Sequence, residues 1–206
     1  MPTRTAFLES LRSSRLLGIL RDAPASSLRD LSSVVRESGL RFLEVALNTP
    51  DAFAQIADLR ELLDGVCRIG AGTVLDTSQA REAVAAGATF LVSPCFSKAV
   101  QSFADEHDIP TLPGAMTPTE AWNAYREGAT IVKIFPVKSA GGPGYIRELR
   151  GPFKTVPLLA CGGVNAANAS EYLLAGADAL AFGGSVFAPS RLARGEFDTI
   201  RADLAT

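Results

Sequence analysis

Histidine is almost absent from this chain, which has one, His107, among 206 residues. Zinc sites usually draw on several histidine or cysteine ligands, so the sequence excludes a histidine-rich catalytic metal site. A Ser-His-Asp triad would have to use His107, which stands in the polar stretch Asp105–Asp108, a pattern typical of a solvated helix end. The three cysteines are an odd number without paired spacing, so no disulfide framework is expected and a reducing cytoplasm is the simpler compartment.

Long hydrophobic runs and an excess of one charge are also lacking. No run approaches ~18 apolar residues, so no membrane span is expected. The early apolar stretch Leu16–Leu20 is too short for a secretory signal. Twenty basic and 22 acidic residues give a net charge of −2, which does not favour nucleic acid or an anionic membrane as partner. With 47% hydrophobic and 20% charged residues, we expect one globular domain over residues 1–206.

Short apolar runs recur along the chain, and their first residues lie 20 to 26 positions apart. Most of these runs are apolar on both faces, as parallel strands buried on both sides are. Amphipathic stretches such as Ser27–Ser38 and Thr117–Glu127 lie between them. The eight predicted strands are Leu16–Leu20, Arg41–Leu47, Cys67–Ala71, Thr89–Ser93, Ile109–Leu112, Thr130–Phe135, Val156–Ala160 and Ala177–Phe182.

Helix boundaries agree with alternating strands and helices. Thr117–Glu120 reads Thr-Pro-Thr-Glu, a capping box with proline at the first helical position. Four glycines end helical patterns just before a strand, where a left-handed residue is wanted: Gly39, Gly87, Gly128 and Gly176. The sequence therefore predicts an α/β fold, a (β/α)8 TIM barrel, with an extra N-terminal helix at Thr3–Ser14 and a terminal helix near Arg191–Leu204. A doubly wound open sheet is the alternative, although no Gly-x-Gly-x-x-Gly turn follows the first strand.

Two charged residues interrupt strands that are otherwise apolar. Lys133 lies within Ile131–Phe135, and Glu44 lies within Phe42–Leu47. Burial lowers the pKa of a lysine, which makes the neutral amine a usable nucleophile, and a neighbouring carboxylate can transfer protons. A buried structural ion pair, or a lysine whose stem packs while its head reaches water, explains the pattern about equally well. If any of the four lysines forms a Schiff base, it is Lys133.

Function in such a barrel sits at the carboxyl ends of the strands. Glycine-rich segments follow the last two predicted strands, at Cys161–Asn165 and Gly183–Ser185, and in many barrels these loops bind phosphate. Tight turns without a ligand are the alternative interpretation. Arg21 ends the first strand, where it is either a carboxylate clamp or a surface residue paired with Asp22.

Seven ordered motifs, taken together, resemble the family of 2-keto-3-deoxy-6-phosphogluconate (KDPG) and 4-hydroxy-2-oxoglutarate (KHG) aldolases, which are class I pyruvate aldolases. The resemblance runs from about Leu16 to Phe187. Its motifs are Leu43–Val45, Gly70–Val74, Val92–Pro94, Pro113–Pro118, Lys133–Pro136, Gly162–Val164 and Gly183–Ser185.

This resemblance implies a role for each matching residue. It places the Schiff-base lysine at Lys133 and the general acid/base at Glu44. It implies that the remaining site residues bind substrate: Thr73 orients it, Pro94 and Phe135 line the pyruvyl pocket, Arg21 binds the carboxylate, and Gly162, Gly163, Gly184 and Ser185 hold phosphate. It also implies a homotrimer with no metal or cofactor, because the intermediate is an imine of the lysine itself.

The implied reaction is reversible cleavage of KDPG to pyruvate and glyceraldehyde 3-phosphate, and of KHG to pyruvate and glyoxylate. Two positions depart from the family pattern: Asn48 stands where an arginine is common, and Cys161 where a threonine is common. Asn48 leaves a 2-keto-3-deoxy-6-phosphogalactonate substrate open. A phosphosugar isomerase or epimerase, and a barrel that binds a phosphometabolite without turnover, are the competing functions.

Overall fold

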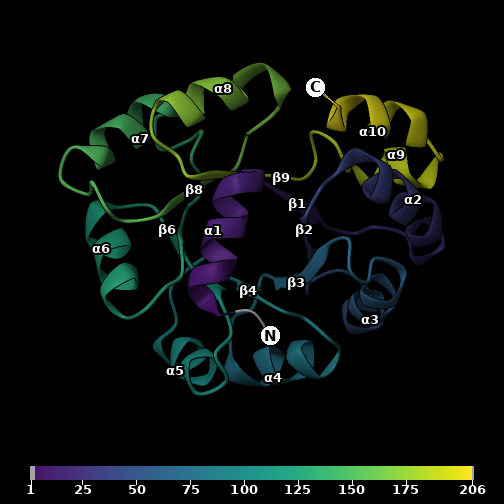
Figure 1. Cartoon of the computed structure of the whole chain (residues 1–206), viewed down its shortest axis with the longest axis horizontal. Helices are drawn as coiled ribbons and strands as arrows, with labels where there is room; N and C mark the ends of the chain where they lie inside the picture. Colours follow the sequence, from purple (N-terminus) through teal and green to yellow (C-terminus); the bar gives the residue numbers. More distant parts are fainter. Residues whose placement is uncertain (1–2, 206) are drawn as a thin grey trace.

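In the computed structural model, which describes residues 3–205, nine parallel strands form one sheet in the order β5-β4-β3-β2-β1-β9-β8-β7-β6 (Figure 1). The strands are β1 (Leu16–Leu20), β2 (Phe42–Ala46), β3 (Arg68–Gly72), β4 (Leu91–Val92), β5 (Thr111–Leu112), β6 (Gly114–Ala115), β7 (Val132–Ile134), β8 (Leu158–Cys161) and β9 (Ala179–Phe182). Each of the eight predicted runs contains or overlaps its strand, and the predicted TIM-barrel fold is confirmed.

The predicted fifth strand is the exception in detail, because it continues past Leu112 and is split. Pro113 lacks a backbone N–H and separates β5 from β6. The ladder nevertheless continues across the break, since the Lys133 N–H donates to the Pro113 carbonyl over 2.9 Å and the Phe135 N–H to the Ala115 carbonyl over 3.0 Å. The two ends of the sheet are thus consecutive pieces of one strand, which closes the barrel.

Helices surround the barrel as a ring (Figure 1). They are α2 (Leu28–Ser38), α3 (Ala52–Leu62), α4 (Thr77–Ala85), α5 (Lys98–Glu106), α6 (Pro118–Arg126), α7 (Pro143–Arg150), α8 (Ala166–Leu174), α9 (Pro189–Ala193) and α10 (Phe197–Leu204), with a short 3-10 turn at Ala25–Ser27. The single terminal helix predicted at Arg191–Leu204 is wrong: Gly195, with φ of 70°, separates α9 from α10. No helix of the described residues is long and apolar enough to cross a membrane.

The predicted helix boundaries hold at the residues that carried them. Thr117 accepts from the Glu120 N–H while Glu120 accepts from the Thr117 N–H, so the capping box at the start of α6 is confirmed. The four glycines named above have φ between 76° and 107°. His107 is the C-cap of α5, where its Nδ1 lies 2.7 Å from the Phe103 carbonyl oxygen.

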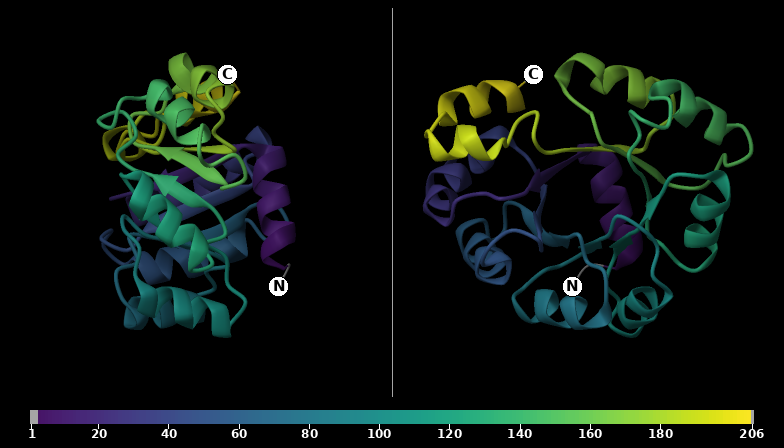
Figure 2. Two further views of the ribbon diagram at one scale, coloured as in Figure 1. Left: turned by 90° about the vertical axis from the view of Figure 1, so that its left-hand side faces the viewer. Right: turned by 180° about the vertical axis from the view of Figure 1, so that it is seen from behind.

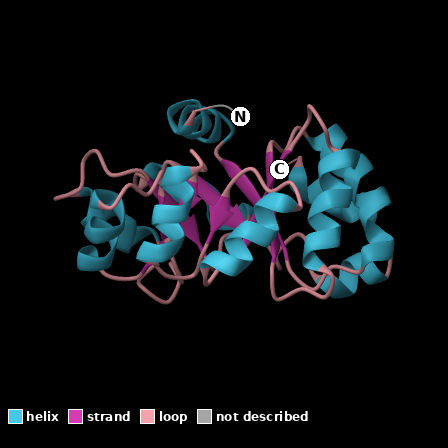
Figure 3. Cartoon of the chain, turned by 90° about the horizontal axis from the view of Figure 1, so that it is seen from below, coloured by secondary structure: helices cyan, strands magenta, loops and turns pink. Residues whose placement is uncertain are grey.

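The extra N-terminal helix, α1 (Arg4–Ser14), lies across one open end of the barrel (Figures 2 and 3). Its buried residues are Phe7 and Leu11. The Phe7 ring lies 5.1 Å from the ring of Phe42 and 5.3 Å from that of Phe90, centroid to centroid. Since Phe42 begins β2 and Phe90 precedes β4, α1 closes the end of the barrel where the strands begin.

Alternation along the strands decides which side chains face the interior. Phe42 faces the aromatic cluster under α1, so Glu44, two residues further along β2, faces the interior nearer the carboxyl end. The same rule aligns Ile131 and Lys133 toward the interior along the chain entering β7. The strand ladder therefore carries both charged residues toward the open, carboxyl end.

Candidate functional site

Glu44 is buried, with 2% of its surface exposed, and its Oε2 has no hydrogen-bond partner within residues 3–205. Gly72, at the end of neighbouring β3, makes room for this carboxylate, because a Cβ there would lie 2.5 Å from Glu44 Oε1. Burial raises the pKa of Glu44, and the charges of Lys133 and Arg21 lower it in part. A buried carboxyl group with an oxygen that has no hydrogen-bond partner lowers the stability of the fold. Such a group is suited to proton transfer, which indicates a functional role.

Lys133, on β7, is 7% exposed. Its Nζ lies 4.9 Å from the centre of the Phe135 ring, so the amine sits over an aromatic face. No ion pair within 4 Å joins Lys133 to a carboxylate anywhere in the described chain. A tight structural ion pair with Glu44 is therefore not what holds this lysine, although its charge is near enough to lower the pKa of Glu44.

Cys161 completes the buried polar centre from β8. It is 2% exposed, and the nearby charge of Lys133 lowers the pKa of its thiol in part. Burial raises the pKa of the Cys161 thiol to about 11, so the thiol remains protonated at neutral pH. At this position, where the family pattern has threonine, the structure places a small buried side chain close enough to Lys133 to feel its charge.

Arg21 and Thr73 meet at the rim of the barrel. The Arg21 Nη2 donates to the Thr73 Oγ1 over 3.4 Å, and no ion pair with Asp22 forms. Thr73 has φ of 60°, a left-handed conformation that is strained for a β-branched residue. A strained backbone of this kind persists only where the surrounding structure holds it in place. Here the conformation of Thr73 directs its hydroxyl group toward Arg21, which follows β1.

Pro94 lies at the end of β4, close to the split fifth strand. A Cβ at Gly114 would collide with the Pro94 carbonyl, so glycine is required where these backbones approach. The Ser93 hydroxyl donates to the Cys95 carbonyl over 2.7 Å and shapes this turn. The structure thus brings Pro94 to the same end of the barrel as Thr73.

A pocket of about 570 Å³ opens at this end of the barrel, over β8, β9 and β1. Ser185 donates to the Val164 carbonyl over 3.1 Å, and Asn168, in the first turn of α8, donates to the Gly163 carbonyl over 2.9 Å, which ties the two glycine-rich loops in place. The predicted residues that line this pocket are Arg21, Phe135, Gly162, Gly163, Gly184 and Ser185. Lys133, Glu44, Thr73 and Pro94 lie outside its lining, and Lys133 lies next to it, with its Nζ 4.9 Å from the centre of the Phe135 ring.

Two residues at this end were not foreseen as part of the site. Lys138 lines the pocket and packs on Gly163, where a Cβ would lie 2.7 Å from its Cδ. Gly72 sets the position of Glu44. Gly72 lies within the Gly70–Val74 motif and Lys138 follows the Lys133–Pro136 motif, but the sequence did not show that each contacts a residue of another segment. No group of three or more His, Cys, Asp and Glu side chains suited to a metal ion occurs among residues 3–205.

Fold and site together define a barrel enzyme that acts on a small molecule. Residues 8–202 match the KDPG and KHG aldolase family. A 2-dehydro-3-deoxy-phosphogluconate aldolase of Treponema pallidum (strain Nichols) is 34% identical over 195 residues, 94% of this chain and 92% of that protein. The KHG/KDPG aldolase of Escherichia coli (strain K12) is 36% identical over 166 residues, 79% and 76% of the two chains.

The solved structures agree with the sequence relatives. KDPG aldolase from Legionella pneumophila, with pyruvate captured at low pH as a covalent carbinolamine intermediate, has a TM-score of 0.89 and 25% identity to this chain. The match covers 99% of this chain and 97% of that one. The chain belongs to the KDPG and KHG aldolase family and is a lyase, a class I aldolase.

Proposed function

We propose that this protein reversibly cleaves KDPG to pyruvate and glyceraldehyde 3-phosphate, and KHG to pyruvate and glyoxylate. The observation that carries the proposal is a buried amine, Lys133, in the same barrel interior as a buried carboxylate, Glu44. Membership in the aldolase family supports the substrate class. An isomerase or epimerase would have no use for a nucleophilic amine, and a simple binding protein would have no use for either group.

In this mechanism the Lys133 amine attacks the C2 ketone and forms a carbinolamine. Glu44 supplies the proton with which water leaves, and a protonated imine results. Glu44, directly or through water, then removes the C4 hydroxyl proton; the C3–C4 bond breaks and its electrons move into the imine. The aldehyde departs, and protonation of the enamine at C3 followed by hydrolysis releases pyruvate and regenerates the amine.

The remaining predicted residues hold the two ends of the substrate. Arg21 clamps the carboxylate and Thr73, which already contacts Arg21, orients the pyruvyl group. Pro94 and Phe135 line the pyruvyl pocket. Backbone N–H groups of Gly162, Gly163, Gly184 and Ser185 hold the phosphate at the start of α8, and Lys138 adds a cation beside them.

The proposal extends to the setting of the enzyme. We take residues 1–206 as one barrel domain that assembles as a homotrimer, as the family resemblance implies. Three free cysteines, one of them exposed, support a reducing cytoplasmic location. The balanced charge supports a small-molecule partner and neither nucleic acid nor membrane.

Reductive trapping tests the central step. Borohydride added in the presence of pyruvate should attach one pyruvyl group to the wild-type chain, and peptide mass spectrometry should locate it on Lys133. Lys133→Ala should acquire no label and show no turnover, while its circular dichroism spectrum stays that of the wild type. Label on another lysine, or none on the wild type, would contradict the assignment.

The substrate is resolved by comparing kcat/KM for three compounds: KDPG, its phosphogalactonate epimer and KHG. We expect KDPG to be cleaved best. A preference for the epimer would point to Asn48, exposed in the loop after β2, as the group that reads the sugar configuration. A strong preference for KHG would withdraw the phosphate role from the two glycine-rich loops.

A further inference from the structure

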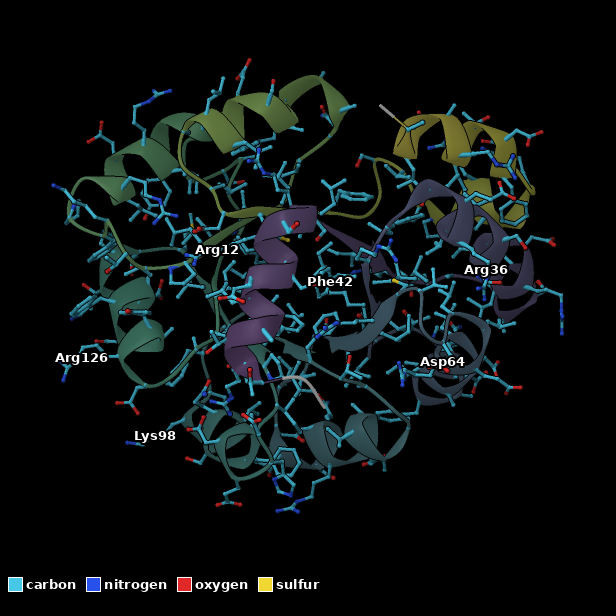
Figure 4. All side chains as sticks on the ribbon, viewed as in Figure 1. Arg12, Arg36, Phe42, Asp64, Lys98 and Arg126 are labelled. Atoms are coloured by element: carbon cyan, nitrogen blue, oxygen red, sulfur yellow. The ribbon has the colours of Figure 1, made fainter. Side chains whose placement is uncertain are left out.

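A second pocket, of about 640 Å³, lies at the opposite end of the barrel, beside α1. Three of its lining residues are arginines: Arg41 just before β2, Arg60 near the end of α3, and Arg68 at the start of β3. Arg68 lies near the ring of Phe42, which Figure 4 labels next to α1. This second pocket shares no lining residue with the pocket over the glycine-rich loops.

No carboxylate lines this pocket. Within the described chain, the guanidinium groups of Arg60 and Arg68 have neither a hydrogen-bond acceptor nor an ion-pair partner, and Arg41 donates only to the Val66 carbonyl, over 3.2 Å. Other arginines near this end of the barrel do form ion pairs. In α1, Arg4 is paired with Asp105 and Arg12 with Asp178. Three cations sharing one pocket without an acid repel each other, and a bound anion would remove that repulsion.

Arg68 is held in place by the closure of the barrel. Its guanidinium carbon lies 5.8 Å from the ring centres of both Phe7 and Phe42. Burial against these rings lowers the pKa of Arg68, because water solvates the charge poorly there. A guanidinium group that is held against aromatic rings and poorly hydrated is pre-organised to bind an oxyanion. It can donate two parallel N–H hydrogen bonds to such a group.

Neutral donors surround the three cations. Ser10 and Ser13 line the pocket from α1, and their hydroxyls make no hydrogen bond within residues 3–205. Gly39 and Gly65 expose backbone at φ of 76° and 70°, with no atom near where a side chain would be. A phosphoryl group offers several acceptor oxygens to such donors, and the volume falls in the range of pockets for whole metabolites.

We propose that this pocket is a binding site for a small organic phosphate carrying at least two negative charges, separate from the aldolase site. The charge is read by Arg41, Arg60 and Arg68, and the serine hydroxyls of α1 complete the set of donors. The ligand class follows from the chemistry of the lining: unpaired forked cations, hydroxyl donors and no acid.

Pyrophosphate is the probe, titrated at low ionic strength into the deuterated, 15N-labelled protein. We expect the backbone amide signals of Gly39, Gly65 and Cys67 to shift and saturate. Arg41→Gln and Arg60→Gln should each weaken the apparent affinity read from these signals by about tenfold, the loss of one charge-assisted contact. Arg126→Gln, which removes an equal charge from α6 on another side of the barrel (Figure 4), should leave it unchanged.

Pyrophosphate bound at the aldolase site would instead shift the backbone amide signals of Gly162 and Gly163. Binding at the two ends of the barrel is therefore detected by different signals. Shifts confined to those glycines would overturn the proposal, as would equal weakening by all three variants, which indicates unspecific attraction. Borohydride labelling with pyruvate, measured on each variant, verifies that the barrel and its catalytic end are intact. Saturable shifts at both ends, with only the Gly39 group sensitive to Arg41 and Arg60, would support two sites.

Discussion

The two ends of the barrel treat buried charge in opposite ways. At the carboxyl end, Lys133 and Glu44 are buried and neither forms an ion pair within residues 3–205, and a pocket over the glycine-rich loops opens at this end. At the other end, α1 closes the barrel, and the guanidinium of Arg68 rests on phenylalanine rings. The first arrangement buries reactive groups, whereas the second packs the rings of Phe7, Phe42 and Phe90 against one another. Stability and chemistry are therefore separated along the strand direction.

Replacing Glu44 with glutamine should have the largest effect, and only at the catalytic end. We expect kcat for KDPG cleavage to fall by about 10²- to 10⁴-fold, since Glu44→Gln cannot exchange protons. Pyruvate release in a coupled assay measures this. A kcat near that of the wild type would contradict a proton-transfer role for Glu44. It would also contradict the assignment of catalysis to the carboxyl end of the barrel.

The same variant has a pH signature in stability. Folding raises the pKa of Glu44 above 4.5, so the folded protein favours the neutral acid. At a pH below the ordinary pKa of glutamate, the Glu44 carboxyl is protonated in both the folded and the unfolded wild-type protein. The wild type and Glu44→Gln should therefore have the same Tm there. As pH rises through the raised folded value, only the wild type must hold a buried charge. The Tm difference in favour of the variant should grow from acid to neutral pH; a constant difference would contradict this.

Phe7→Ala probes the closed end. Removing a fully buried ring that packs on Phe42 and Phe90 should cost about 3–5 kcal/mol of unfolding free energy. We expect kcat at 25 °C to stay within about twofold of wild type, because the catalytic pair is carried by the strands and not by α1. Urea unfolding and steady-state kinetics measure the two quantities, and Phe7→Leu should lose less stability. A kcat that falls in step with stability would mean that the ends are coupled.

Gly72→Ala should produce the smallest of these effects and the most specific one. The new methyl would lie 2.5 Å from Glu44 Oε1, the mobile end of that side chain, so the carboxylate moves while the fold remains. A shift of about 1 Å in a catalytic group can lower kcat by up to about 10²-fold. Gly144→Ala, in α7 where nothing lies within 4 Å, is the matched control and should keep full activity. Equal kcat for the two variants would contradict the positioning role of Gly72.

Local pattern was enough to predict the strands and the charged residues within them. Lys133 and Glu44 stand out because each interrupts an apolar run, and a strand buried on both faces leaves them nowhere to go but the interior. The break at Pro113 was missed because the apolar run before it reads as a complete strand. The contact between Lys138 and Gly163 and the gathering of Arg41, Arg60 and Arg68 join elements far apart in sequence, and no spacing encodes such approaches.

Helix α1 is synthesised before the residues on which it packs. Its apolar side rests on Phe42 and Phe90, so it has nothing to dock on until the ribosome has delivered the chain through β4. An isolated helix of 11 residues is only marginally stable in water. During translation the apolar side chains of Phe7 and Leu11 are therefore exposed to solvent until β2 and β4 have been synthesised. The helix that closes the barrel can pack only after those strands exist.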